Sequence, residues 1–225
     1  MQSTRVVVLL SVCERPKNHL LITLSLSLVA LNVLISLILC HPGGLWEDWP
    51  RSRTVPFSQT TTTVHEDFAL VTRFQSTQSA HFWTLVNVYG PCQGVSRINF
   101  INWLMALNIP SNEDWLLVGN FNFIRSPDNR NKPGGSYSDM ITFNDFIRTQ
   151  ALIELPIKGC EYTWSNMQLD PLLEQIDWFF TSNNWTSSYP HTMVKPLGRP
   201  VSDHIPCVFN IETSIPRSKL FRFES

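Results

Sequence analysis

The sequence predicts an α/β or α+β fold in which strands and helices form layers. The segment "WLLVGNF" (115–121) is apolar on both faces, which is typical of a strand covered on both sides. Two other segments, 97–108 and 139–150, carry apolar residues at helical spacing. The chain has 225 residues, is 43% hydrophobic and contains eight Trp, so it can form one sizeable core and is not of the disordered class.

Strand-like segments precede the buried strand. They are "FALVTRF" (68–74) and "FWTLVNVY" (82–89). Alternation in the second segment places Trp83, Leu85 and Asn87 on one face. It places Thr84, Val86 and Val88 on the other face.

Two helices are expected next. Residues 97–108 place one apolar stripe on a helix that Pro110 ends: Ile98, Ile101, Leu104 and Met105. Residues 139–150 group Phe143, Phe146 and Ile147 on one face. Further short strands are expected within "EYTWS" (161–165), "LLEQIDWFF" (172–180) and "HIPCVFNIE" (204–212).

The N-terminal part differs from the rest. Sixteen of the 21 residues from 20 to 40 are apolar and none is charged. As a helix this run would span about 30 Å, the thickness of a bilayer core. We therefore expect an N-terminal hydrophobic segment, 1–42, with a candidate transmembrane helix over 20–40. A signal peptide, a buried element or translated non-coding sequence are the alternatives.

Charge and cysteine content exclude some functions. The formal net charge of −1 argues against a protein that binds nucleic acid through phosphate contacts alone. The candidate local patch is the loop 124–135, with Arg125, Arg130 and Lys132, although a solvated loop would look the same. The five Cys are scattered and form no C-x-x-C, so they predict neither a zinc site nor a disulfide framework.

Polar residues interrupt or end the expected strands in four motifs: "NVYGP" with Tyr89, "GNFN" with Asn120 and Asn122, "QIDWFF" with Asp177, and "VSDHIPC" with Asp203 and His204. Each motif alone has an ordinary structural explanation, such as turn capping or an ion pair. Their order and spacing together are the stronger signal.

With "GGLWEDW" (43–49) and "YTWSN" (162–166), these motifs resemble the endonuclease/exonuclease/phosphatase superfamily. The closest resemblance is to the apurinic-type endonuclease domain of plant long-interspersed-element (non-LTR) retrotransposons, and it covers about residues 43–225. It implies a four-layer sandwich of two mixed β-sheets flanked by helices. It also implies cleavage of DNA or another phosphodiester with Mg²⁺ or Mn²⁺. A nuclear location follows from the family, or a membrane location if 20–40 inserts.

The resemblance assigns roles to the first three site residues. Tyr89 would contact the phosphate, and Asn122 would orient the phosphate or the attacking water. Asn120 stands where the family has the aspartate that activates water. An amide has nearly the shape of a carboxylate but accepts no proton, and loss of a general base costs about 10²- to 10⁴-fold in rate.

The other three residues follow "QIDWFF" and "VSDHIPC". Asp177 matches the acid of an I-D-R-type motif. Asp203 would orient His204 or help to hold the metal, with Asn120 as a weaker metal ligand. His204 would stabilise the transition state, because a donor held by a neighbouring acid can stabilise developing charge on oxygen.

The pattern also departs from the family. Glu14 is the one acid before the apolar run and Glu47 follows the "GGLW" marker, so no metal-binding Glu is evident and the first strands are expected to be missing. Trp178 follows Asp177 where Arg is usual, which removes an expected ion pair. The sequence thus favours a degenerate retroelement-derived phosphodiesterase. The alternatives are an active Mg²⁺-dependent endonuclease and a non-catalytic, membrane-anchored or nucleic-acid-binding remnant.

Overall fold

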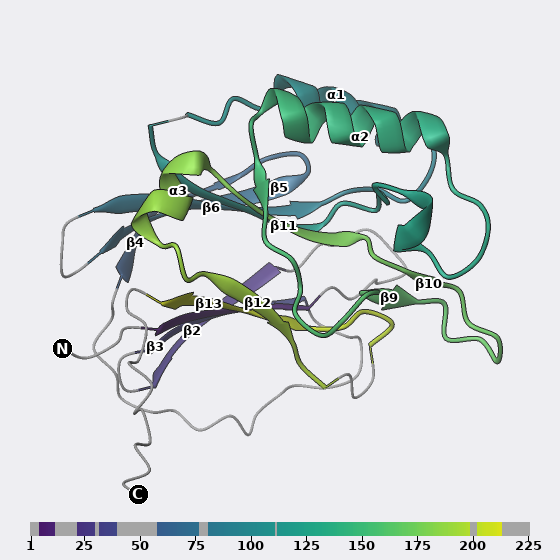
Figure 1. Cartoon of the computed structure of the whole chain (residues 1–225). Helices are drawn as coiled ribbons and strands as arrows, with labels where there is room; N and C mark the ends of the chain where they lie inside the picture. The colour runs from purple at the N-terminus through teal and green to yellow at the C-terminus, as the bar shows by residue number, and fades with distance from the viewer. Residues whose placement is uncertain are drawn as a thin grey trace, which may run out of the picture.

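Two large β-sheets form the body of the protein, and two helices cover the outer face of one of them (Figure 1). The computed structural model describes residues 5–11, 22–29, 32–39, 58–76, 81–110, 112–198 and 202–212. One sheet has six strands in the order β4-β5-β6-β7-β11-β8. Their bounds are Ser58–His65, Ala69–Ser76, Phe82–Tyr89, Asp114–Asn120, Asp177–Thr181 and Ile153–Glu154. Because β6 and β7 are parallel and the other pairs are antiparallel, this sheet is mixed.

The second sheet has five strands in the order β12-β13-β1-β3-β2. Their bounds are Met193–Pro196, Cys207–Glu212, Arg5–Ser11, Asn32–Leu39 and Ile22–Val29. The β1 strand is antiparallel to β13 and parallel to β3, so this sheet is also mixed. A small third sheet pairs β9 (Trp164–Ser165) with β10 (Leu173–Glu174).

The N-terminal part corrects the transmembrane prediction. Residues 22–29 and 32–39 form the antiparallel strands β2 and β3, where the sequence predicts one helix over 20–40. The run "ITLSLSLV" alternates Leu with Ser or Thr, and this period of two suits a strand. Of the helices that the structure describes, none is both long and apolar enough to cross a membrane.

The structure also differs from the expectation that the first strands are missing. The β1 strand lies inside the five-stranded sheet, between β13 and β3, and so joins the two ends of the described chain. The boundary between the expected segments 1–42 and 43–225 lies outside the described residues, as do Glu14 and Glu47.

Three helices are described. They are α1 (Val95–Ala106), α2 (Tyr137–Thr149) and α3 (Asn183–Ser188), and a single 3₁₀ turn covers Pro127–Asn129. The α1 and α2 helices lie side by side over the six-stranded sheet, and α3 contacts β7 (Figure 1). The Ser136 side chain caps α2 by accepting from the backbone N–H of Asp139. The described helices thus lie on the six-stranded sheet, and the expected helical layer beyond the five-stranded sheet is not among them.

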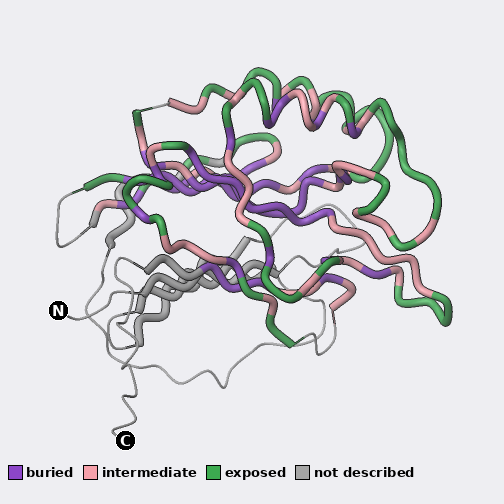
Figure 2. Tube along the Cα trace, in the orientation of Figure 1, coloured by how far each residue is buried: buried purple, intermediate pink, exposed green. Residues whose placement is uncertain are grey.

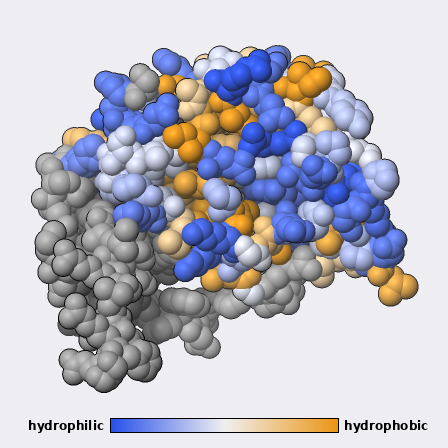
Figure 3. All heavy atoms as spheres, in the orientation of Figure 1, coloured by the Kyte–Doolittle hydropathy of each residue, from blue (hydrophilic) through white to orange (hydrophobic). Residues whose placement is uncertain are grey.

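The two helices bury their apolar residues differently. In α2 the expected face is confirmed, since Phe143, Phe146 and Ile147 are buried. In α1 the expected stripe is wrong in part, because Ile98 and Met105 are 60% and 45% exposed. The helix is apolar on most sides, so spacing alone does not identify the side that packs. Apolar groups consequently reach the surface of the helical layer, where Figure 3 shows orange patches.

The core has two layers, one on each face of the six-stranded sheet. Leu85 and Leu116 belong to the cluster between the two sheets, whereas Val86 and Leu117 belong to the cluster beneath α1 and α2. Successive residues of one strand therefore enter opposite clusters, and Figure 2 shows the central strands as continuously buried. This confirms the prediction that β7 is covered on both faces.

Candidate active site

Three of the candidate residues form one row across neighbouring strands. Tyr89, the last residue of β6, is in register with Asn120, the last residue of β7. Asn120 is in register with Asp177, the first residue of β11. The strand-end row Tyr89–Asn120–Asp177 therefore brings together residues that are 88 positions apart along the chain (177 − 89). Directly opposed residues on paired strands point to the same face of a sheet.

Two glycines allow the backbone to approach closely behind this row. Gly119 has a φ of 129°, and a Cβ there would lie 2.2 Å from the carbonyl oxygen of Val88. A Cβ at Gly90 would lie 2.5 Å from the carbonyl oxygen of Phe121. Larger residues would force the ends of β6 and β7 apart. The glycine of "GNFN" is thus required by the close packing of the two strands.

The two asparagines shape the turn after β7. Asn120 is 1% exposed, and its Oδ1 accepts a hydrogen bond of 2.8 Å from the backbone N–H of Asn122. Asn122 has a left-handed φ of 54°, which Asn tolerates better than most residues, and its Nδ2 donates to the carbonyl oxygen of Gly90. A carboxylate at position 120 could accept the same backbone hydrogen bond. An Asp at this position would therefore keep the turn, whereas the amide of Asn120 cannot accept a proton.

His204 pairs with the acid of the strand-end row. Its Nδ1 lies 2.8 Å from Oδ2 of Asp177, and the two side chains are 4% and 10% exposed. An ionised carboxylate can only accept, so Nδ1 would carry the proton where Asp177 is ionised. Asp203, expected to orient His204 or to help hold the metal, accepts a 3.0 Å hydrogen bond from Nε1 of Trp164 through its carboxylate.

This arrangement lies in a fold that several solved structures share. The endonuclease domain of TRAS1, a telomere-specific non-LTR retrotransposon, is 12% identical with a TM-score of 0.50, over 68% of this chain and 67% of that chain. The chain therefore shares its fold with this endonuclease domain.

Two further structures are similar at lower TM-scores. AP endonuclease LMAP from Leishmania major is 16% identical with a TM-score of 0.48, over 65% of this chain and 55% of that chain. The Xenopus laevis APE2 catalytic domain is 14% identical with a TM-score of 0.48, over 68% of this chain and 58% of that chain. This chain thus spans little more than half of either protein. No protein-family model matches the sequence, and the comparison with curated proteins gave no match.

The described residues do not supply the set of ligands expected for a divalent cation. Within the described residues, no group of three or more His, Cys, Asp or Glu side chains could hold a metal ion. The two expected ligands, Asn120 and Asp203, already accept hydrogen bonds from the chain. Mg²⁺ needs several oxygen ligands, usually with at least one or two carboxylates, and the described donor set does not fit it.

The loop 124–135 is not a free basic patch. Each of its three cations pairs with an acid from a distant part of the chain: Arg125 with Glu154, Arg130 with Glu174 at 3.3 Å, and Lys132 with Asp170 at 2.7 Å. These pairs neutralise the charge that was expected to contact phosphate. Any nucleic-acid contact of this loop would have to compete with them.

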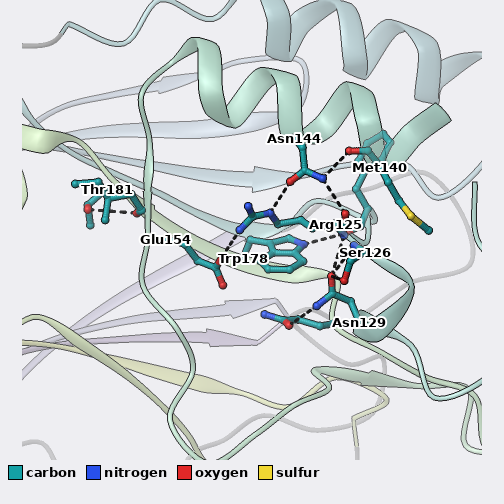
Figure 4. A network of polar contacts seen from close by, with 11 residues as sticks. Arg125, Ser126, Asn129, Met140, Asn144, Glu154, Trp178 and Thr181 are labelled. Carbon is teal, nitrogen blue, oxygen red and sulfur yellow. Dashed lines mark hydrogen bonds and ion pairs between the residues drawn. The ribbon is translucent and has the colours of Figure 1, made fainter. Parts of the chain in front are cut away.

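Trp178 is the centre of a polar network beside the site (Figure 4). Its Nε1 donates to the carbonyl oxygen of Phe123 at 2.7 Å, and the Arg125 guanidinium lies 5.4 Å from the indole centroid. Arg125 also donates to Oδ1 of Asn144 at 2.9 Å and pairs with Glu154. Trp178 cannot form the ion pair expected of an Arg at this position. Arg125, which packs over the Trp178 indole, forms an ion pair with Glu154 instead.

The segment "YTWSN" makes contacts near the site that the motif alone does not predict. In the structure Thr163 is 0% exposed, and its hydroxyl accepts from the backbone of Asp177. Trp164 contacts Asp203 as described above and forms an isolated bridge with His204. A polar Thr inside an aromatic segment was the available signal, since a buried hydroxyl needs a hydrogen-bond partner.

Proposed function

We propose that this chain is a degenerate nuclease domain that binds DNA or another phosphodiester and hydrolyses it weakly or not at all. The observation that carries the proposal is the place of Asn120, buried in register between Tyr89 and Asp177. This is the position at which the resemblance implies a water-activating aspartate. An amide there cannot take a proton from water.

The remaining groups suit recognition of a phosphate. An imidazole held by a carboxylate, as His204 is by Asp177, can donate to a phosphate oxygen. Tyr89 is half-buried at the end of β6 and offers a phenol at the same sheet edge. These groups could orient a phosphodiester, but the one carboxylate of the row, that of Asp177, is already paired with His204. Binding without rapid cleavage follows.

An active Mg²⁺- or Mn²⁺-dependent endonuclease is the second candidate. The Asp177–His204 pair favours it, because this pair has the geometry of an oriented transition-state donor. It would need metal ligands beyond the described residues, and it would need water activation without a carboxylate at position 120.

The test is nicking of supercoiled plasmid by the full chain with Mg²⁺ or Mn²⁺, beside Asn120→Asp and an EDTA control. Fluorescence anisotropy with a labelled DNA duplex at increasing salt measures binding in parallel. The double variant Asn120→Asp/His204→Gln is the matched control, because activity restored at this site must depend on His204.

We expect salt-sensitive DNA binding and no nicking by the natural chain. Nicking by Asn120→Asp alone, lost again in the double variant, would identify the amide as the lesion. Nicking by the natural chain that EDTA abolishes would overturn the proposal in favour of an active endonuclease. The absence of DNA binding at low salt would remove the binding role.

A further inference from the structure

Thr163 lies where the two halves of the Asp177–His204 pair meet. Asp177 begins β11 in the six-stranded sheet, whereas His204 precedes β13 in the five-stranded sheet. The two residues are 27 positions apart, so local structure does not set their relative position. Thr163 comes directly before β9 and is 0% exposed.

The hydroxyl of Thr163 holds the start of β11. Its Oγ1 accepts hydrogen bonds of 3.1 Å from the backbone N–H groups of both Ile176 and Asp177. These bonds fix the backbone from which the Asp177 side chain leaves. Since the site is buried, no bulk water can replace the hydroxyl as the acceptor for two amides.

The backbone of Thr163 holds the other half of the pair. Its carbonyl oxygen accepts a 2.7 Å hydrogen bond from the N–H of Ile205, the residue after His204. Its own N–H donates to the carbonyl oxygen of Glu174 at 2.9 Å, which ties it to β10. One buried residue is therefore bonded to the segments of both Asp177 and His204.

We propose that Thr163 is a positioning residue that sets the distance between Asp177 and His204 and thereby fixes the tautomer of the imidazole. The hydroxyl holds the carboxylate in reach of Nδ1, and Nδ1 keeps the proton. The catalytic or binding use of this pair rests on the function proposed above. The positioning itself is a property of the folded chain and can be measured without substrate.

The test is long-range ¹H–¹⁵N correlation NMR of the full-length, ¹⁵N-labelled chain, which reports the nitrogen that carries the imidazole proton. The signals of His204 are those absent from His204→Gln. We compare Thr163→Val, which removes the hydroxyl and keeps the shape, with Thr163→Ser, which keeps the hydroxyl. Thr181→Val is the matched control, because Thr181 is also 0% exposed and lies at the opposite end of β11.

The natural chain, Thr163→Ser and Thr181→Val should show one His204 tautomer with the proton on Nδ1, and Thr163→Val should lose it. An unchanged tautomer in folded Thr163→Val, or the same loss in Thr181→Val, would overturn the proposal. If Thr163→Val does not fold, Thr163→Cys takes its place, because a thiol is a poor acceptor. Retention of the tautomer by both Thr163→Cys and Thr163→Ser would then overturn it. The NMR experiment needs no DNA, so a chain that neither binds nor nicks DNA would still test the positioning role of Thr163. The two proposals can therefore be refuted independently.

Discussion

Asn120→Asp should destabilise the protein by placing a second carboxylate opposite Asp177. Directly opposed Cβ atoms on antiparallel strands lie about 4.5–5.5 Å apart. Two charges about 6 Å apart at an effective dielectric constant of about 20 repel by about 3 kcal/mol. Asn120 is 1% exposed, so solvent screens little of this repulsion, although a protonated His204 beside Asp177 would offset part of it. We expect this repulsion to lower the free energy of unfolding by about 2–3 kcal/mol at pH 7, in addition to the cost of burying the new charge.

Urea unfolding of the full chain, read by tryptophan fluorescence, measures this loss. Asn87→Asp is the control, since Asn87 is 7% exposed and its register partners, Leu70 and Val118, are apolar. Both variants bury a new carboxylate, but only Asn120→Asp places it against another acid. The difference between them corresponds to about 4–12 °C in Tm for a chain of this size.

The pH dependence provides a second readout of the same variant. Burial and the neighbouring acid raise the pKa of the introduced carboxyl above its unfolded value of about 3.9. The penalty is therefore absent below about pH 4, grows as the pH rises through the folded pKa, and is constant above it. Equal losses in Asn120→Asp and Asn87→Asp at pH 7, or a penalty that persists on acidification, would refute the reasoning that the strand-end row brings these side chains together.

Three other predictions concern stability and use urea unfolding of the full chain. Gly119→Ala should lower the free energy of unfolding by about 3 kcal/mol or more, because its Cβ would collide with the carbonyl oxygen of Val88 at an unfavourable φ. A decrease below about 1 kcal/mol would contradict the close approach of β6 and β7. Trp178→Phe should lower the free energy of unfolding by about 1–3 kcal/mol, because the buried carbonyl of Phe123 loses its indole donor. An unchanged urea midpoint would count against this hydrogen bond. Burial raises the pKa of Tyr189 from 10.0 to about 12, so its stabilising contribution is complete below pH 10 and is lost as the pH rises to 12. The loss amounts to about 2–3 kcal/mol and should be absent in Tyr189→Phe, and a similar alkaline decline in both proteins would exclude this cause.

Local patterns in the sequence determined much of the six-stranded sheet and the composition of the site. The alternation of "FWTLVNVY" predicts a strand, and the apolar run before Gly119 predicts a strand buried on both faces; both predictions are confirmed. The face of α2 also follows from its spacing. These features depend on periods of two or 3.6 residues, which one segment displays by itself.

Tertiary structure alone decided how the segments meet. The apolar residues from 20 to 40 suit a helix or two strands, and pairing with β1 selects the strands. The sequence of the loop 124–135 suggests a phosphate-binding patch. In the structure its three cations form ion pairs with Glu154, Glu174 and Asp170. Asp203 is the neighbour of His204 in sequence, but Asp177 is its partner in space. Such contacts depend on the register between distant strands, and no local period encodes that register.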